Sequence, residues 1–310
     1  MPTVSIILPV YNGIRYLEKS VITVLQQEFQ DFEFLVLDDC STDGSWEYLL
    51  GLPDKRIVLY RNEKNMGLFY NLNFLIKKSS SSIIKIWSQD DVMYPHCLKE
   101  VVDFHKKHPE ISFSYTNTDY INAEDEIMDL RKVDNTPEIV SSSLHTRIAF
   151  ITGSIAGNIA NVAINKTALD RVGLFNETMK ISGDFEMWVR LAAQQPVGFI
   201  KKPLVQLRSH TEQLSMQEEY YIYHLKEDLK VYKILLKGIN LQKQKEGIGL
   251  LRNQKLLFYY TLMLKAFFKG KFNTGFKFFN SLFHFDNFFI LSWLYFKKKV
   301  LKIRNYEDVV

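Results

Sequence analysis

The chain has 310 residues, enough to bury one large hydrophobic core or two smaller ones. Hydrophobic content of 46% and charged content of 24% are typical of an ordinary globular protein. The two cysteines, Cys40 and Cys97, are too few for a disulfide framework or a zinc cluster and indicate a reducing compartment. The first residues run straight into an apolar strand pattern, so we expect no signal peptide.

The first 110 residues alternate strand patterns with helix patterns. Residues 4–8 form a continuous apolar run, typical of a central parallel strand, and Pro9 is expected to end it. Residues 15–27 show helical periodicity. Further strands are expected at 33–37, 57–60 and 83–87, and further helices at 43–50, 68–78 and 95–107. Repeated βα units with short connections predict an α/β fold with a doubly wound, mostly parallel sheet flanked by helices.

Beyond residue 110 the pattern is less regular. Strands are expected at 111–121, 158–164 and 198–207, helices at 166–171 and 184–193, and helical structure from residue 218 to about residue 296. The chain therefore divides into an α/β domain over residues 1–215 and a helical extension over residues 216–310. Within the first domain we separate a half at 1–110 from a half at 111–215.

The helical extension differs from the rest in charge and in aromatic content. Residues 1–220 carry 22 lysines and arginines against 29 acidic residues, whereas residues 221–310 carry 17 against 6. The last 60 residues hold 17 of the 43 aromatic side chains. Such a basic, aromatic segment favours contact with an anionic membrane surface; a helical subdomain that packs its phenylalanines inward is the alternative. Its uncharged stretches are shorter than the ~20 residues of a transmembrane helix.

Three acidic clusters stand at intervals in the first two thirds of the chain. Asp38-Asp39 and Asp90-Asp91 each follow a predicted strand, and Asp184 and Glu186 open a predicted helix. Open α/β sheets bind ligands at the carboxyl ends of their strands, so we expect the clusters to share one crevice. Carboxylates gathered there repel one another unless a cation lies among them. A divalent metal that carries a diphosphate fits, which indicates an enzyme of nucleotide sugars.

The loop after the first strand narrows the enzyme class. Dinucleotide oxidoreductases and sugar nucleotidyltransferases place a glycine-rich phosphate loop there, whereas this chain has Pro9-Val10-Tyr11-Asn12. Both classes are therefore disfavoured.

Five short motifs carry a family resemblance. They are Pro9-Val10-Tyr11-Asn12, the acidic segment 38–45, Asn65-Met66-Gly67, Ser88-Gln89-Asp90-Asp91 and Gly183-Asp184-Phe185-Glu186-Met187-Trp188. In order and spacing, over about residues 3–215, they resemble the family 2 inverting glycosyltransferases. The resemblance implies a GT-A fold, which is Rossmann-like, and a nucleotide-diphosphate sugar as donor, with a UDP-sugar favoured. It also implies Mg²⁺ or Mn²⁺ as cofactor.

The same resemblance assigns the nucleotide site. It implies that Asp39 binds the uracil or the ribose, with Asp38 in support. Residues expected to shape the base pocket or to line the nucleotide are Pro9, Tyr11, Asn12, Asn65, Gly67 and Asp90.

For the metal, the resemblance implies Asp91, as the last acid of an Asp-x-Asp-type motif, together with His210. The position that is usually acidic at the start of this motif is Ser88 here, which leaves fewer carboxylates for the cation. Diphosphate oxygens and waters normally complete a Mg²⁺ shell, so two acids can suffice. A purely structural role is the alternative for His210.

Asp184 matches the family's catalytic base, the carboxylate that removes the acceptor hydroxyl's proton. It also stands where it would cap the helix that follows. Glu186 and Trp188 are expected to bind the acceptor, Trp188 by stacking on a sugar from a position one turn after Asp184. An apolar core position is the alternative for Trp188.

The sequence thus predicts an inverting glycosyltransferase that moves one sugar to a hydroxyl of a lipid-linked or cell-surface glycan precursor, as in bacterial O-antigen or capsule assembly. The Gln-x-x-Arg-Trp motif of processive synthases is absent from the sequence, which favours single addition. We expect a cytoplasmic enzyme that rests peripherally on the inner face of the membrane, and no nucleic-acid partner. The alternative is a catalytically inactive nucleotide-sugar-binding or membrane scaffold protein, because of Ser88.

Overall fold

The computed structural model describes residues 1–128, 135–210 and 220–302. The chain divides into two compact units, one of Met1–His145 with Ser154–Gln213 and one of Thr146–Gly153 with Leu214–Val310. This division falls close to the predicted boundary at residue 215. It differs in one segment: Thr146–Gly153 belongs to the helical unit, although the sequence pattern placed it in the α/β domain.

Within the described ranges, the first unit is built on one ten-stranded sheet of order β3-β2-β1-β4-β9-β6-β10-β5. Its first part is parallel and consists of β1 (Val4–Val10), β2 (Phe32–Asp38), β3 (Ile57–Arg61) and β4 (Ile83–Ile86). The α/β class predicted from the sequence is confirmed.

The second part of the sheet is mixed. Its long strands are β6 (Phe113–Ile121), β9 (Val162–Asn165) and β10 (Val197–Arg208). β9 runs antiparallel to both β4 and β6, and β6 runs parallel to β10. These two antiparallel steps restore the original direction, so β10 ends at the same edge of the sheet as β1, β2 and β4. The short antiparallel partners are β5 (Val92–Met93) and β8 (Ile139–Val140) on β10 and β7 (Ile127–Met128) on β6.

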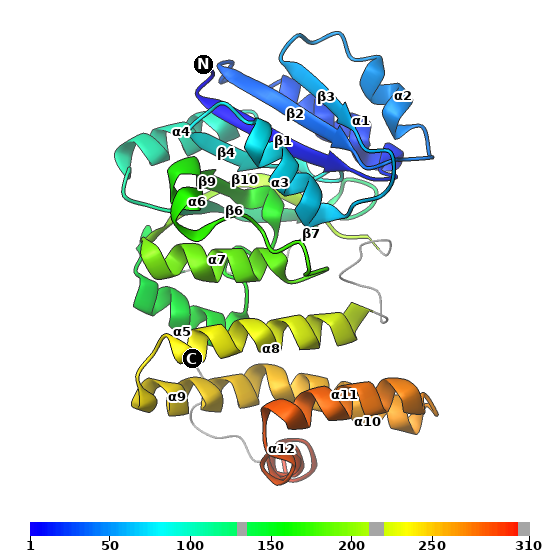
Figure 1. Ribbon diagram of the computed structural model, residues 1–310, viewed down its shortest axis with the longest axis vertical. Helices are drawn as coiled ribbons and strands as arrows, with labels where there is room; N and C mark the ends of the chain where they lie inside the picture. The colour runs from blue at the N-terminus through cyan, green and yellow to red at the C-terminus, as the bar shows by residue number, and fades with distance from the viewer. Residues whose placement is uncertain (129–134, 211–219, 303–310) are drawn as a thin grey trace. The chain divides into compact units, whose positions relative to one another are not determined.

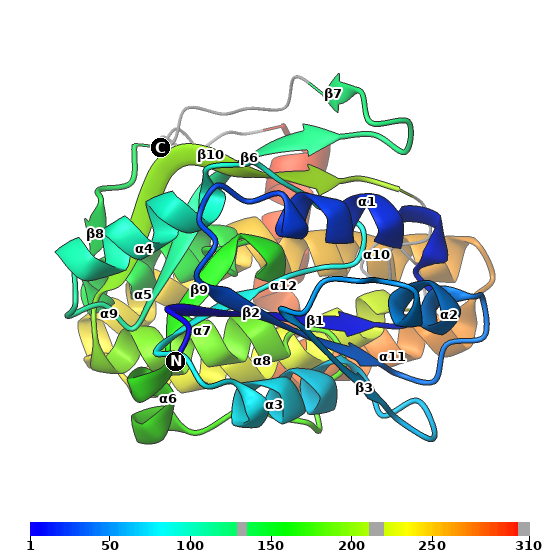
Figure 2. The same cartoon turned by 90° about the horizontal axis from the view of Figure 1, so that it is seen from above.

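Helices cover both faces of the parallel strands. They are α1 (Ile14–Leu25), α2 (Ser45–Leu50), α3 (Leu68–Lys78) and α4 (Cys97–Lys107), followed later by α6 (Lys166–Val172) and α7 (Gly183–Gln194). Figure 2 shows α1 and α4 on one side of β1 and β2, and α3 on the other. The helical spacing of Leu17, Val21 and Val24 turns these three side chains into the core against the continuous apolar strands.

The first strand is longer than predicted. We expected Pro9 to end it, but β1 continues to Val10 and pairs Pro9 with Leu37. The N–H and C=O of one residue point to the same side of its strand, and those of the residue two positions on point to that side again. Ile7 O accepts from Trp87 N, so Ile7 faces the β4 side. Pro9 therefore faces that same side, where β4 has already ended at Ile86. The missing N–H costs no ladder bond.

The second unit is helical. It contains α8 (Tyr221–Lys237), α9 (Leu241–Leu251), α10 (Leu257–Phe268), α11 (Phe272–Phe285) and α12 (Phe288–Tyr295), with π-helical turns η4 (Arg252–Leu256) and η5 (Phe296–Val300). Part of α5 (Ser142–Thr152) joins it, through Phe150 stacked on Tyr232. Figure 1 shows α10 and α11 side by side and α12 almost end-on. None of the described helices is long and apolar enough to cross a membrane.

Candidate active site

Most of the predicted site residues follow strands that end at one edge of the sheet. Tyr11 and Asn12 follow β1, the pair Asp38-Asp39 closes β2, the pair Asp90-Asp91 follows β4, and His210 follows β10. Open α/β sheets bind their ligands at this edge. The strand directions thus bring acids and a histidine from both halves of the domain to one side of the molecule.

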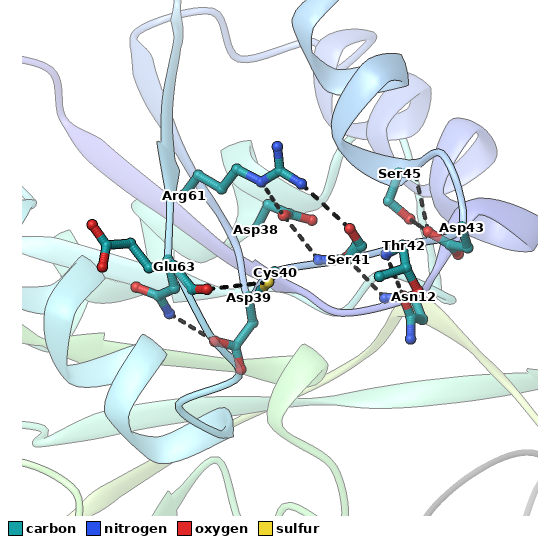
Figure 3. A network of polar contacts seen from close by, with 11 residues as sticks. Asn12, Asp38, Asp39, Cys40, Ser41, Thr42, Asp43, Ser45, Arg61 and Glu63 are labelled. Carbon is teal, nitrogen blue, oxygen red and sulfur yellow. Dashed lines mark hydrogen bonds and ion pairs between the residues drawn. The ribbon is translucent and has the colours of Figure 1, made fainter.

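The loop after β1 is held by the loop after β2 (Figure 3). Asn12 N donates to Ser41 Oγ at 2.9 Å, and Asn12 Oδ1 accepts from Thr42 N at 2.9 Å. Asp43 Oδ2 accepts from the N–H of Ile14, the first residue of α1, at 2.9 Å. Asn12 has φ 46°, in the left-handed region that asparagine tolerates better than most residues. The two predicted nucleotide loops therefore form one preformed structure.

Asp38 is fully buried and serves this loop structure. Its Oδ2 accepts from Ser41 N at 3.1 Å and lies 3.3 Å from Arg61 Nε. A buried carboxylate needs such a charge partner, because burial in a low-dielectric interior penalises the ionised form. Asp38 thus stabilises the loop that follows β2; the supporting role in nucleotide binding that the sequence suggests for it stays a prediction.

Asp39 organises the third predicted loop. Its Oδ1 accepts from Met66 N at 2.8 Å and from Asn62 Nδ2 at 2.7 Å, and its Oδ2 accepts from Gly67 N at 2.9 Å. Gly67 has φ +89°, a conformation that glycine adopts without strain. The exposed Asn65 lies in the same loop. Asp39 therefore links the end of β2 to the loop that starts α3, and its oxygens retain lone pairs for a further donor.

Asp90 lies against His210. Its Oδ2 is 3.1 Å from His210 Nε2, and its Oδ1 accepts from the hydroxyl of Ser88. Burial opposes ionisation of Asp90, but the hydrogen bonds from His210 and Ser88 outweigh it and lower the pKa of this carboxyl. The sequence assigned His210 and Asp91 to the metal and Asp90 to the nucleotide; in the structure His210 contacts Asp90, the neighbour of Asp91.

Asp91 is more deeply buried than Asp90. Its Oδ1 accepts from the backbone N–H of Arg208 at 2.8 Å. Its Oδ2 finds no hydrogen-bond partner among the residues that the structure describes. Burial and the neighbouring charge of Asp90 raise the pKa of Asp91 well above its usual value. A cation beside this carboxylate would relieve both effects.

Arg208, which the sequence analysis did not single out, holds the acidic loop in place. Its Nε donates to the backbone carbonyl of Asp90 at 2.8 Å, and its Nη1 donates to that of Asn122 at 2.9 Å. The guanidinium also lies over the ring of Tyr16, 4.5 Å from its centroid. Its place directly before Ser209-His210 was the only signal in the sequence.

Gln89 is a second residue that was missed. Its Oε1 accepts from Tyr11 N at 2.9 Å and its Nε2 donates to Tyr11 O at 3.2 Å, so it binds the exposed Tyr11 by both backbone groups. A Cβ on Gly13 would lie 2.4 Å from the Gln89 side chain, so this contact requires glycine at position 13. Gln89 thus fixes the loop after β1 to the acidic loop after β4.

The described residues contain no group of three or more His, Cys, Asp or Glu side chains arranged to hold a metal ion. They do offer the buried Oδ2 of Asp91 and the adjoining pair of Asp90 and His210. These groups fit a divalent cation that takes the rest of its shell from phosphate oxygens and water, as Mg²⁺ commonly does.

Asp184 lies half-buried in the first turn of α7. The preceding Gly183 packs against Phe69 of α3, where an added Cβ would come within 2.7 Å of the ring. α3 in turn begins directly after Gly67, which Asp39 holds. A continuous set of contacts therefore positions Asp184 relative to the loop at the end of β2.

Two predicted acceptor-binding residues have structural roles instead. Both carboxylate oxygens of the buried Glu186 accept from Arg190, at 2.7 and 2.8 Å, and Arg190 also donates to Leu174 O. Trp188 is fully buried, with its ring 5.0 Å from that of Phe113. Neither side chain is available to an acceptor sugar, so the alternative of an apolar core position is correct for Trp188.

Comparisons with known proteins agree with this geometry. A family model described as "Glycosyl transferase family 2" matches residues 5–168. An uncharacterized glycosyltransferase of Rickettsia felis is 26% identical over 213 residues, which are 68% of this chain and 35% of the relative. An uncharacterized glycosyltransferase of Rickettsia typhi is 27% identical over 248 residues, 76% of each chain. The chain therefore spans only about a third of the first of these relatives.

Solved structures show the fold. Residues 1–349 of S. aureus TarS, in complex with UDP-GlcNAc, align with a TM-score of 0.63 and 17% identity over 81% of this chain and 71% of that one. The mannosyltransferase PcManGT of Pyrobaculum calidifontis, in complex with GDP-Man and Mn²⁺, aligns with a TM-score of 0.57 and 14% identity, over 81% and 70%. The expected GT-A-like fold is confirmed.

Proposed function

Because this chain belongs to glycosyl transferase family 2, we propose that it transfers a single sugar from a nucleotide-diphosphate sugar to a hydroxyl group. The observation that carries the proposal is the gathering of Asp39, Asp90 and His210 at the carboxyl edge of the sheet. At this edge, Asp39 would accept a hydrogen bond from the base or the ribose. Asp90 and His210 would lie near the cation that the diphosphate binds.

A UDP-sugar is the donor that we favour. TarS, which shares the fold, is described in complex with UDP and with UDP-GlcNAc. Asp39 is buried in this structure and held by the N–H groups of Met66 and Gly67, but its oxygens keep lone pairs that would accept from the imide N–H of a uracil or from a ribose hydroxyl once the nucleotide lies against it. The exposed Tyr11 and the loop of Asn65 flank the base.

Asp91 and His210, with Asp90 beside them, are the residues that would hold a Mg²⁺ or Mn²⁺ ion. When bound, such an ion supplies positive charge that stabilises the departing diphosphate. PcManGT is described with Mn²⁺ in its complex. With Ser88 in place of an acid, diphosphate oxygens and water would supply a larger part of the shell of such an ion.

Asp184 acts as the general base in this proposal. It accepts the proton of the acceptor hydroxyl while that oxygen forms a bond to the anomeric carbon from the face opposite the phosphate. The bond from the anomeric carbon to the phosphate oxygen breaks, and the nucleoside diphosphate leaves with its electron pair. A single displacement of this kind inverts an α-linked donor to a β-linked product.

We further propose that the acceptor is a lipid-linked or cell-surface glycan precursor, such as those of bacterial O-antigen or capsule assembly. The support is the composition of the second unit, in which basic and aromatic side chains suit a protein that rests on the inner face of the cytoplasmic membrane. A lipid-linked acceptor is presented at that surface.

A catalytically inactive nucleotide-sugar binder is the second candidate, favoured by Ser88 in place of an acid and by the absence of a three-ligand cluster from the described residues. Nucleoside-diphosphate release from UDP-, GDP- and dTDP-sugars, with Mn²⁺ or with EDTA, separates the two. The proposal predicts metal-dependent release from one donor when membrane lipid extract is supplied as acceptor. Donor binding without release from any donor would establish the binder.

A further inference from the structure

The second unit exposes an apolar stripe on α11. Phe272, Phe276 and Phe279 lie at the spacing i, i+4, i+7, which places them on one face of the helix, and all three are exposed. The adjoining face, with Phe278 and Leu282, is buried against the rest of the unit. The apolar stripe of α11 is therefore wider than the rest of the unit covers: one part of it is buried and the part beside it is exposed.

The following helix, α12, continues this surface. Phe289, Trp293 and Phe296 again stand at i, i+4 and i+7, and Phe289 and Trp293 are 78% and 60% exposed. The rings of Trp293 and Phe296 stack at 6.0 Å. Such large aromatic side chains are costly to leave in water, so a contiguous set of them indicates a surface that is covered in use.

One side chain joins the two stripes. The ring of Phe288 lies 6.1 Å from that of Phe279 on α11 and 5.6 Å from that of Phe289 on α12. The exposed aromatic residues of α11 and α12 thus form one patch and not two separate ones. We call the patch formed by Phe272, Phe276, Phe279, Phe288, Phe289, Trp293 and Phe296 the aromatic surface.

The aromatic surface is held on a fixed frame. Arg252 donates to both carboxylate oxygens of Asp286, at 2.6 and 2.7 Å, directly before α12 begins. Asn287 caps α12 through its Oδ1, which accepts from Phe289 N at 2.9 Å. Leu291 is fully buried, and so anchors the inner face of α12. The exposed rings are therefore presented by a preformed helix, which lowers the entropy cost of binding.

The positive charge around the aromatic surface indicates the kind of partner that covers it. Residues 257–302 contain eight lysines and a single acidic residue, Asp286, whose carboxylate is already paired with Arg252. Lys297, Lys298 and Lys299 follow α12 directly. A second copy of this chain would bring like charges together, whereas an anionic lipid surface offers both apolar depth and negative charge.

We propose that the aromatic surface of α11 and α12 is an interfacial docking site for an anionic lipid bilayer. The phenylalanine and tryptophan rings enter the boundary between headgroups and acyl chains, and the lysines contact the lipid phosphates. The inference deepens the membrane location proposed for the acceptor. It does not depend on catalysis, because the surface contains none of the residues assigned to donor, metal or proton transfer.

Flotation of the full chain with lipid vesicles, without donor or acceptor, tests the proposal. Vesicles of phosphatidylcholine with phosphatidylglycerol should bind it at least about tenfold more tightly than phosphatidylcholine alone, and about 0.5 M NaCl should weaken that binding. Phe289→Ser with Trp293→Ser should reduce the binding by about tenfold or more, because two large exposed rings no longer enter the interface.

The matched control changes two equally exposed apolar residues of the α/β unit, Leu50 (59% exposed) and Ile127 (66% exposed), to serine. Binding to anionic vesicles should stay within about twofold of the native chain, because neither residue belongs to the aromatic surface. Lipids brominated on the acyl chains should quench tryptophan emission of the native chain, and this quenching should fall in Trp293→Phe. The other three tryptophans give the background that remains in Trp293→Phe: Trp87 and Trp188 are fully buried, and Trp46 lies half-buried on α2.

Three results would overturn the proposal. They are failure to bind anionic vesicles, binding that survives the change of Phe289 and Trp293, and a dimer that this double change dissociates while vesicles bind neither form. The last result would assign the surface to a second copy. Nucleotide-sugar binding and donor cleavage, measured in the same variants, report on the proposed function separately, so neither test decides the other.

Discussion

Neighbouring acids in this site have different tasks, set by their backbone partners. Asp38 is bound by Ser41 N of its own loop and by Arg61 of β3, whereas Asp39 receives two backbone N–H groups from the loop that starts α3. Asp91 is pinned by Arg208 N, and Asp90 faces His210. The sequence predicts that such pairs stand at a strand end, but which member faces the ligand depends on side-chain direction after the strand stops. Sequence pattern carries little information on that direction.

Asp39→Asn should weaken nucleotide binding strongly. The amide has one acceptor atom where the carboxylate has two, and its NH₂ group would face a backbone N–H of Met66 or Gly67. We expect a loss of about tenfold or more in UDP affinity, from the weaker acceptor and from displacement of the loop. Isothermal titration with UDP measures it. The exposed Asp31, changed to asparagine, is the control, and unchanged affinity in Asp39→Asn would contradict the assignment.

Arg208→Lys should disturb the position of the acidic loop after β4 while leaving the fold intact. Lysine keeps the charge but cannot donate at once to the carbonyls of Asp90 and Asn122. We expect a weaker apparent affinity for Mn²⁺, by about tenfold, with the midpoint of thermal unfolding lowered only modestly. A titration of Mn²⁺ in the presence of UDP, followed by electron paramagnetic resonance, measures this affinity. Native Mn²⁺ affinity in the variant would show that Arg208 does not position the acidic loop.

At the scale of elements, the strand and helix order over residues 4–107 follows largely from apolar patterning, because β1, β2 and β4 are buried on both faces. The edge strand β3 is only partly buried. What could not be predicted depends on packing between elements. Trp188 and Glu186 share α7 with Asp184, yet both are buried, since α7 is covered on more sides than an amphipathic pattern implies. Likewise, the antiparallel insertion of β9 between β4 and β6 has no local signal in the sequence.

Gly183→Ala tests the contact between α3 and α7. The added Cβ would lie 2.7 Å from the Phe69 ring, so the ring or one of the two helices must shift. We expect a loss of about 1–3 kcal/mol in the free energy of unfolding, which Phe69→Leu should partly restore in a double-mutant cycle. Gly249→Ala is the control, because no heavy atom that the structure describes comes within 4 Å of its Cβ outside the adjoining backbone. Equal stabilities of the two variants would refute close packing at Gly183.

For the molecule as a whole, two buried histidines lead us to expect that the α/β unit becomes less stable in acid. Burial lowers the pKa of His105 and of His145 to about 4. A histidine in the unfolded chain titrates near pH 6.5. Above about pH 6.5 both histidines are neutral in both states, and the free energy of unfolding is highest. As the pH falls toward about 4, the unfolded chain takes up protons that the folded chain does not, and this free energy decreases. His105 also bonds to Ser114 Oγ through Nε2, at 2.9 Å.

We therefore expect the free energy of unfolding to fall between about pH 6.5 and about pH 4, and to fall less steeply in His105→Gln. Urea unfolding followed by tryptophan emission measures it, since the buried Trp87 and Trp188 both report on this unit. The exposed His284, changed to glutamine, is the control. A slope that is the same in His105→Gln as in the native chain would exclude His105 as a source of the acid sensitivity.

A comparison of the native chain with Asp184→Asn, in two assays on the same donor, decides whether Asp184 is the base of sugar transfer. We expect the variant to bind the donor and Mn²⁺ as the native chain does, while acceptor-dependent release of nucleoside diphosphate falls by about 10²–10⁴-fold. Release at the native rate in Asp184→Asn would contradict this assignment and leave the base to another group at the same edge of the sheet.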